Sequence, residues 1–464
     1  MPSASPLEQI ATFVAQSSPS SDARARALAA VIDTVGVTLA GSTEPVAGIV
    51  RRTFGPLDPP APGLRPDGPA GRLDLCSVWG VPFHAPAPVA ALCNGTAAHA
   101  LDYDDMCFVS LAHPSAPLVP GVIAAGELAR SPGRDVLDAY VVGFELQARL
   151  GQLMNPRHYQ RGWHCTSTLG AMSSAAGASR LLRLDAAATA HALAIAASSA
   201  SGLKENFGTM VKPLHAGLAA RDGITAALLA QSGVTGSDKA VDGPQGFLHA
   251  FDSERADLRG AVADLGTRWE ILETGVTVKL YPSCAGTHPT LDALLDLRAG
   301  EVFGADAVAA VEIDVDPIVP TILIYDRPAT PLEAKFSMPF CAAAAIVFGR
   351  IGIDTFDEAR LRDPGVMAVM SRVAMRVDER IGTGKPALTE ARVRVTLTDG
   401  RVLVRDAHGA RGYPANPATQ SELDAKFLAC AGRALSTERA HLLLERLKNL
   451  ERGGLDLALN PGLD

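Results

Sequence analysis

A short acidic segment near residue 100 contains the first residues that could do chemistry. Asp102, Asp104 and Asp105 fall within four positions, and His113 follows soon after. Neighbouring carboxylates repel one another, which raises the pKa of the most buried one toward the range of a general acid or base. Helix capping or a solvated turn would also bring such residues together, so both interpretations stay open.

Two further groups lie at or just before the starts of apolar helices. His164 precedes Thr166 and Ser167, either of which can cap the helix that follows. The positive end of a helix dipole lowers the pKa of an imidazole and attracts anions. Lys212 and His215 are three residues apart, which places a cation and an acid/base group within one turn. The alternatives are a structural His164, an exposed Lys212 and a His215 that only caps its helix.

A polar loop ahead of another helix contains Lys279, Cys284 and His288. Pro289 suits the first position of that helix, so Cys284 lies close to the positive end of its dipole. The dipole and the ammonium of Lys279 both favour a thiolate, and we expect the pKa of Cys284 to fall below the roughly 8.5 of a free cysteine. A thiol that only fills space is the alternative.

A weaker group contains Tyr325 and Arg327. An arginine can bind a carboxylate through two parallel hydrogen bonds, although a salt bridge within the loop would use it as well. No candidate set has the spacing of zinc ligands or of a glycine-rich phosphate loop, so we expect neither a metal nor an organic cofactor. The inventory of Asp, His and Lys suits proton transfer at a carbon α to a carboxylate, where cations hold the carboxylates and stabilise the enolate.

Helices must position most of these groups, because the first 270 or so residues show helical periodicity almost throughout. Asp22 can cap an early helix, and alanine-rich faces near 187–197 indicate central helices that approach one another closely. A stretch rich in Pro and Gly at 55–73 predicts a surface loop. The predicted helices cover residues 22–40, 134–154, 168–182, 185–200 and 216–231.

The pattern changes after about residue 275. Alternating apolar residues predict strands over 307–316 and 393–404, and Asp399-Gly400 is typical of the turn of a hairpin. Helices are expected at 289–299, 355–375 and 419–449.

These two patterns predict a mainly α protein. A large all-helical domain would contain residues 1–275 and be completed by residues 413–464, since the last helices can pack back on the helical body. Residues 276–412 would form a smaller α+β domain.

Composition excludes several classes of function. The formal net charge is −8, and basic residues form no run longer than a pair, so neither nucleic acid nor an anionic membrane is expected as a partner. No apolar stretch reaches the roughly 18 residues of a spanning helix, and the first residues lack the pattern of a secretory signal. Seven scattered cysteines without a Cys-x-x-Cys favour reduced thiols and a cytoplasmic location.

Five motifs, in their order and spacing, resemble the MmgE/PrpD family. The resemblance extends over nearly the whole chain and implies a large helical domain, a smaller α+β lid domain, a homodimer, and no metal or organic cofactor. The family includes 2-methylcitrate dehydratase, cis-aconitate decarboxylase and iminodisuccinate epimerase. The motifs are Asn94-Gly95 through Asp105, His113-Pro114-Ser115, Gly162-Trp163-His164, Lys212 through Gly217, and Lys279 through His288.

The resemblance also carries over site residues. Asp102, His113, His164, Lys212 and Lys279 fall on active-site positions of the decarboxylase branch. The sequence departs from that branch in three places, because Met106, Cys284 and Phe340 stand where the branch has a Thr, a His and a Tyr. These departures count against decarboxylation of that type and leave the shared proton chemistry intact.

We therefore expect a lyase that dehydrates or decarboxylates a small di- or tricarboxylate. An epimerase is the alternative, with Cys284 as a second acid/base group on the opposite face of one carbon. A helical scaffold with a decayed site is a third possibility. For the lyase, Lys212, Lys279 and Arg327 would bind carboxylates, together with His215, His288 and Tyr325. His113 and His164 would move protons, and Asp102 would orient these groups or accept a proton.

Overall fold

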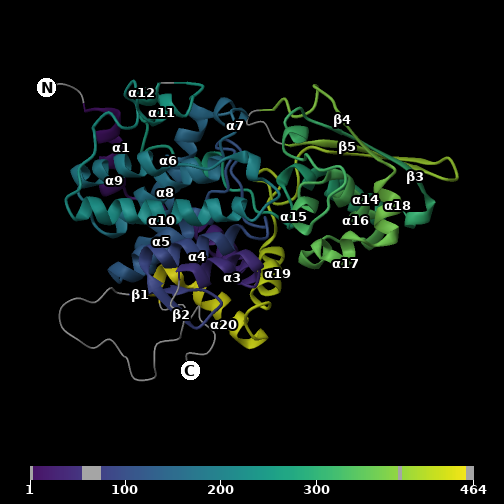
Figure 1. Cartoon of the computed structure of the whole chain (residues 1–464), viewed down its shortest axis with the longest axis horizontal. Coiled ribbons are helices and arrows are strands. Elements are labelled where there is room, and N and C mark those ends of the chain that lie inside the picture. The colour runs from purple at the N-terminus through teal and green to yellow at the C-terminus, as the bar shows by residue number, and fades with distance from the viewer. Residues whose placement is uncertain (1–3, 55–74, 256, 302, 385–388, 456–464) are drawn as a thin grey trace.

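The computed structural model describes residues 4–54, 75–255, 257–301, 303–384 and 389–455. It confirms a mainly α protein with a smaller α+β part, and Figure 1 shows the helices of the first half beside a separate sheet with its own helices. The predicted loop at 55–73 lies outside the described residues. The predicted domain limits stay a prediction. Within the described part, no single helix combines the length and apolar character needed to cross a membrane.

The predicted helices of the first half are confirmed, with ends that shift by a few residues. Ser20, not Asp22, caps α2, since its side chain accepts a hydrogen bond from the Ala23 N–H. The helices are α1 (Pro6–Gln16), α2 (Ser21–Gly41), α3 (Pro45–Phe54), α4 (Ala87–His99), α5 (Ser115–Ala129), α6 (Gly133–Met154), α7 (Arg157–Gln160), α8 (Cys165–Leu181), α9 (Ala186–Ser199), α10 (Val211–Gln231), α11 (Phe247–Ala250), α12 (Leu258–Ala261) and α13 (Glu270–Glu273).

Helix α10 packs against both α4 and α8 at the centre of this helical body. Its closest approach to α4 lies at two glycines, because a Cβ on Gly95 would come within 2.9 Å of Gly217 Cα. The missing side chains allow the two backbones to touch. This contact brings the end of α4, at His99, next to the beginning of α10, which contains Lys212.

One short hairpin in the first half was not predicted. Strands β1 (Leu75–Val78) and β2 (Phe83–Pro86) pair in antiparallel fashion. Four residues per strand are too few for an alternating pattern to stand out in the sequence. The side chain of Asn94 ties the hairpin to α4 by accepting from the Trp79 N–H and donating to Ser77 O.

The second half contains a four-stranded sheet of order β4-β3-β5-β6. The predicted strand at 307–316 and the predicted hairpin are confirmed, and Gly400 in the hairpin turn has φ +87°. Strand β4 pairs with β3 in parallel, and the other neighbours are antiparallel. The strands are β3 (Val308–Val315), β4 (Val373–Val377), β5 (Ala391–Leu397) and β6 (Val402–Ala407).

The predicted helix at 355–375 is wrong in part. Asp363 caps a new helix whose first residue is Pro364, and the chain then enters β4. Proline fits a first helical position but interrupts a continuous helix, which explains the break. The helices of this half are α14 (His288–Gly300), α15 (Pro331–Ala334), α16 (Met338–Phe348), α17 (Glu358–Leu361) and α18 (Pro364–Met370).

The last helices return to the helical body. Helices α19 (Gln420–Ala431) and α20 (Thr437–Lys448) replace the single predicted helix at 419–449, and both contact α2. Figure 1 shows these two helices beside α3 and α4 of the helical body. A Cβ on Gly36 of α2 would come within 2.8 Å of the Phe427 ring, so α19 packs directly on the α2 backbone. This packing places residues of α19 near the end of α4.

Candidate active site

A pocket of about 810 Å³ lies between the helical body and the sheet-containing part. Its wall combines the loop after α4, the starts of α8 and α10, the loop around Cys284 and the turn after β3. Five of the predicted site residues line it, namely Asp102, His113, His164, Lys212 and Cys284.

Asp102 occupies an unusual backbone position in the loop after α4. Its φ is +53°, in the left-handed region that a non-glycine residue adopts only when its surroundings hold it there. Its Oδ1 accepts a hydrogen bond from Lys212 Nζ at 2.7 Å and lies 3.1 Å from Lys279 Nζ. Burial works to raise the pKa of Asp102, but these two ammonium groups hold it far below its usual value. The carboxylate is therefore ionised, and its Oδ2 has no hydrogen-bond partner in the described residues.

Three lysines hold the backbone of this loop, and we call them the carbonyl clamp. Lys335 donates to Leu101 O at 2.6 Å, Lys279 to Asp102 O at 2.9 Å, and Lys426 to Tyr103 O at 2.9 Å. Burial lowers the pKa of Lys335 to about 8. Lys335 belongs to the weaker group around Tyr325 and Arg327, but the sequence alone assigned no role to Lys335 or to Lys426, although each is a single lysine within a largely apolar stretch.

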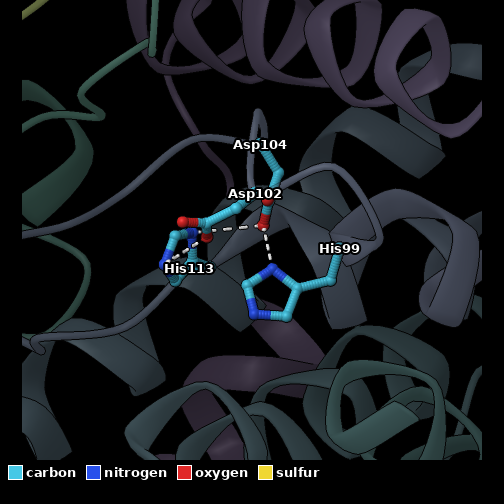
Figure 2. A group of neighbouring side chains, drawn as sticks. All are labelled: His99, Asp102, Asp104 and His113. Atoms are coloured by element: carbon cyan, nitrogen blue, oxygen red, sulfur yellow. Dashed lines mark hydrogen bonds and ion pairs between the residues drawn. The ribbon is translucent and has the colours of Figure 1, made fainter. Parts of the chain in front are cut away.

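Asp104 lies between two imidazoles (Figure 2). Its Oδ2 is 2.8 Å from His99 Nδ1 and 3.2 Å from His113 Nδ1. Lys212 Nζ lies 2.9 Å from the other ring nitrogen of His99, and an ammonium can only donate. His99 Nε2 therefore accepts, and its Nδ1 carries the proton that Asp104 accepts. Burial, reinforced by Lys212, lowers the pKa of His99 to about 3, so this imidazole is neutral.

His113 is the member of this group that reaches the pocket. Its backbone N–H donates to Thr166 Oγ1 at 3.0 Å, which ties the loop to α8. Its Nε2 lies 3.8 Å from Asp102 Oδ1. Burial lowers the pKa of His113 below its ordinary value, while the charge of Asp104 opposes that shift.

His164 lies at the N-terminus of α8, as predicted, but it is itself the N-cap residue, so the cap predicted at Thr166 or Ser167 is wrong. Its Nδ1 lies 3.0 Å from His215 Nδ1, and its Nε2 is buried without a hydrogen-bond partner in the described residues. Burial lowers the pKa of His164 well below its ordinary value, and His99 and Lys212 add to the effect. The predicted direction is confirmed, with burial as the main cause. His215 does not line the pocket and holds the His164 ring from behind.

Four potential metal ligands come together here, although their spacing in the sequence did not indicate such a set. Ligand atoms of His99, Asp102, Asp104 and His113 all lie within 4.8 Å of one another. However, Lys212 already contacts His99 and Asp102, so a divalent cation would meet the charge of an ammonium at close range. These side chains fit proton transfer to and from an anion better than they fit a metal ion.

Of the three neighbouring carboxyls, only Asp105 has a raised pKa. Burial raises it to about 8, as the sequence predicted for the most buried group. Asp105 accepts hydrogen bonds from the Ser115 N–H and from Ser115 Oγ, which also lies 2.7 Å from Tyr140 Oη. It does not line the pocket, so its role is structural rather than that of a general acid.

The prediction of a thiolate at Cys284 is wrong. Burial raises the pKa of this thiol to about 11, the carboxylate of Asp102 adds to the shift, and Lys279 only partly offsets it. Cys284 does line the pocket, but it does so as a neutral thiol at pH 7.

The remaining candidates lie outside the pocket lining. Lys279 is fully buried behind Asp102, and His288 is buried with its Nε2 3.2 Å from Ser283 O. Tyr325 donates its hydroxyl to Phe207 O at 2.9 Å, and Arg327 is exposed. Direct carboxylate binding by Arg327 therefore has no support in this arrangement.

Comparison with known proteins identifies both halves of the chain. Residues 8–258 match the family model of the MmgE/PrpD N-terminal domain, and residues 281–451 match that of the MmgE/PrpD C-terminal domain. A cis-aconitate decarboxylase of Homo sapiens is 31% identical over 390 residues, which cover 81% of this chain and 79% of that protein. The cis-aconitate decarboxylase of Mus musculus is 30% identical over 396 residues, with the same shares covered. A cis-aconitate decarboxylase-like protein, oryM of Aspergillus oryzae, is 28% identical over 398 residues, which cover 81% of each chain.

Proposed function

Because this chain belongs to the MmgE/PrpD family, we propose that it is a lyase acting on a small di- or tricarboxylate. It would move a proton at the carbon α to a carboxylate and release water or carbon dioxide. The observation that carries this proposal is the pocket end where Asp102, ionised between two ammonium groups, adjoins the neutral imidazoles of His113 and His164.

Lys212 is the residue that binds the substrate carboxylate. Two of its three N–H groups are used by Asp102 Oδ1 and His99 Nε2, counting the residues that the structure describes. The third is left for a ligand, and Lys212 lines the pocket. The ammonium also lies near the rings of Phe207 and Phe336, at 5.5 and 5.2 Å from their centroids, so its charge is poorly hydrated and acts strongly on an enolate.

His164 serves as the base at carbon, and His113 as the acid for the leaving group. Asp104 supports a proton on His113, whereas no carboxylate supports one on His164. His113 is thus the more easily protonated of the two. A bound polyanion raises the pKa of both imidazoles, because a nearby negative charge favours their protonated form. In a decarboxylation no proton is taken from carbon, so His164, protonated from solvent once the polyanion is bound, would donate a proton to the carbon that loses carbon dioxide.

The test is incubation of the purified protein in D2O with citrate, 2-methylcitrate, cis-aconitate, malate and aspartate-derived acids, followed by proton NMR. Loss of water or carbon dioxide from one of them is expected. His164→Gln should abolish it, and His408→Gln should not, because His408 is an exposed histidine outside the pocket lining.

Two other outcomes would contradict the lyase. Deuterium uptake with inversion and no net loss would identify an epimerase, although the neutral thiol of Cys284 removes the second base that this alternative expected. Neither conversion nor exchange with any acid would favour a scaffold.

A further inference from the structure

The pocket is much larger than a small polycarboxylate requires. Its volume of about 810 Å³ falls in the upper part of the range, roughly 300–1,000 Å³, that drug-sized ligands fill. A six-carbon tricarboxylate has only about a dozen non-hydrogen atoms, so it would fill a small part of this space. The residues proposed to act on it lie together, since Lys212 contacts Asp102 and His113 lies 3.8 Å from the same carboxylate.

One wall beyond this charged end is an apolar loop between α4 and α5. Phe108, Val109 and Leu111 line the pocket and are only partly buried. Leu111 has φ +47°, a strained conformation for a large side chain. The loop is fixed by hydrogen bonds between Cys107 and Ala112 in both directions. A strained backbone that presents large apolar side chains to a cavity indicates that these side chains contact a ligand.

A second apolar wall comes from the sheet-containing part. Ile318 and Ile322, in the turn after β3, line the same pocket and are again only partly buried. The turn is held by the Asp316 carboxylate, which accepts from the Ile318 N–H at 3.1 Å. Apolar side chains from two loops thus line one cavity, and contiguous apolar surface of this kind is typical of ligand-binding grooves.

The cations elsewhere in the pocket lining do not call for a second anionic group. Lys204 Nζ lies 3.6 Å from the centroid of the Tyr159 ring, a contact that favours its charge while burial lowers its pKa. Arg255 is exposed, so water solvates its guanidinium.

We infer that the natural substrate is a polycarboxylate that carries an alkyl chain of several carbons. The head would bind at Lys212 and the chain would lie between the walls formed by residues 108–111 and 318–322. This inference rests on the proposed function for the identity of the head. The alkyl chain is an additional feature of the substrate, because the proposed reaction at Asp102 and the histidines involves only the polycarboxylate head.

The test compares citrates that carry a methyl, a butyl or a heptyl group on the same carbon. Burial of a methylene group contributes about a fourfold gain, so kcat/KM should rise roughly 50-fold from methyl to butyl. A chain of heptyl length that ends in a carboxylate should lose most of this gain. Binding to His164→Gln, measured by calorimetry, should show the same order of affinities without depending on turnover.

Two variants test the walls separately. Val109→Asn and Ile318→Asn should each lower the heptyl-to-methyl ratio of kcat/KM about tenfold, because each places an amide against the chain. Leu442→Asn is the matched control, since Leu442 is an exposed leucine of α20 that does not line the pocket. Its ratio should match that of the wild-type protein.

The outcomes separate this inference from the proposed function. Turnover or binding that does not depend on chain length, or an equal gain for the carboxylate-ended chain, would overturn the alkyl chain while leaving the lyase in place. Absence of turnover with affinity that rises with chain length would support the chain and refute the lyase. Dissociation of an oligomer by Ile318→Asn would identify the wall as an interface between copies and would also overturn the inference.

Discussion

At the scale of single residues, the histidines of the pocket depend on neighbours that do not line it. Burial is the main reason why His99 is neutral; Lys212 donates to its Nε2, and Asp104 accepts from its Nδ1. His215, which does not line the pocket either, has its Nδ1 3.0 Å from His164 Nδ1. The sequence identified the histidines as candidates but could not pair them, since Asp104 and His113 are joined by a loop whose path no periodicity predicts.

Asp104→Asn should show that Asp104 positions His113 and raises its pKa. Without the carboxylate the pKa of His113 falls further, because Asp104 is the group that raises it. If His113 acts as the acid, the alkaline limb of the pH profile of kcat should move to lower pH, and kcat should drop roughly 10²-fold. Asp105→Asn makes the same chemical change one residue away, outside the pocket, and should not move that limb. Equal profiles for Asp104→Asn and the wild-type protein would refute the assignment.

Asp105→Asn should instead change stability. The pKa of Asp105 is raised to about 8 in the folded state from an ordinary value of about 3.8, so the folded protein binds more protons between these pH values. Its contribution to stability is therefore fully present below about pH 4 and is lost as pH rises toward 8, with a slope of up to about 1.4 kcal/mol per pH unit. Urea unfolding at several pH values should show this slope reduced in Asp105→Asn. An unchanged slope would mean that Asp105 is ionised.

Cys284→Ala should retain turnover within about tenfold of the wild-type value. A thiol with a pKa of about 11 is not a base at pH 7, and its loss removes only a contact at the pocket wall. Steady-state kinetics with the identified substrate would measure this. A loss of roughly 10²-fold or more, the scale of a missing acid or base, would show that the thiol transfers a proton after all.

At the scale of elements, helices and strands with a regular sequence pattern could be predicted, whereas contacts between distant segments could not. The strand at β3 and the hairpin of β5 and β6 followed from alternation and from Asp399-Gly400. The helix expected at 355–375 failed because Asp363 and Pro364 start a new helix, after which β4 pairs in parallel with a strand about 60 residues earlier. A parallel pairing of distant segments leaves no local signal. For the same reason the carbonyl clamp could not be predicted.

Lys426→Met tests how α19 supports the loop after α4. Lys426 Nζ lies 2.7 Å from Asp33 Oδ1 and donates to Tyr103 O. The side chains of Lys426 and Asp33 are both buried. Removal of one partner of a buried ion pair costs about 3–5 kcal/mol in unfolding free energy. The double variant Asp33→Leu/Lys426→Met should recover most of that loss, since no unpaired charge remains. Additive losses in a double-mutant cycle would show that the pair is not coupled.

At the scale of the whole molecule, the last described helices pack against an early helix of the same helical body. Helices α19 and α20 contact α2, and the sheet-containing part lies between these segments in the sequence. The pocket lies where the two parts meet, so the residues that line it are widely separated in the sequence, from Asp102 to Thr389. The homodimer implied by the family resemblance stays a prediction.

Activity should survive exhaustive dialysis against EDTA. The four potential ligands around Asp104 are accompanied by Lys212 and Lys279, whose charges oppose a divalent cation. Metal content by mass spectrometry and turnover before and after chelation would test this together. Activity that returns only when zinc, iron or magnesium is added would contradict it.

The three lysines of the carbonyl clamp determine when the site can form during synthesis of the protein. Lys279, Lys335 and Lys426 reach carbonyls that lie 177, 234 and 323 residues earlier in the chain. A nascent chain that has passed residue 258 already contains all four histidines around the pocket and Lys212, which donates to the Asp102 side chain, but none of the three lysines of the carbonyl clamp. Contacts of such long range form late in folding. The active site therefore matures only after Lys426 has been synthesised and has left the ribosome.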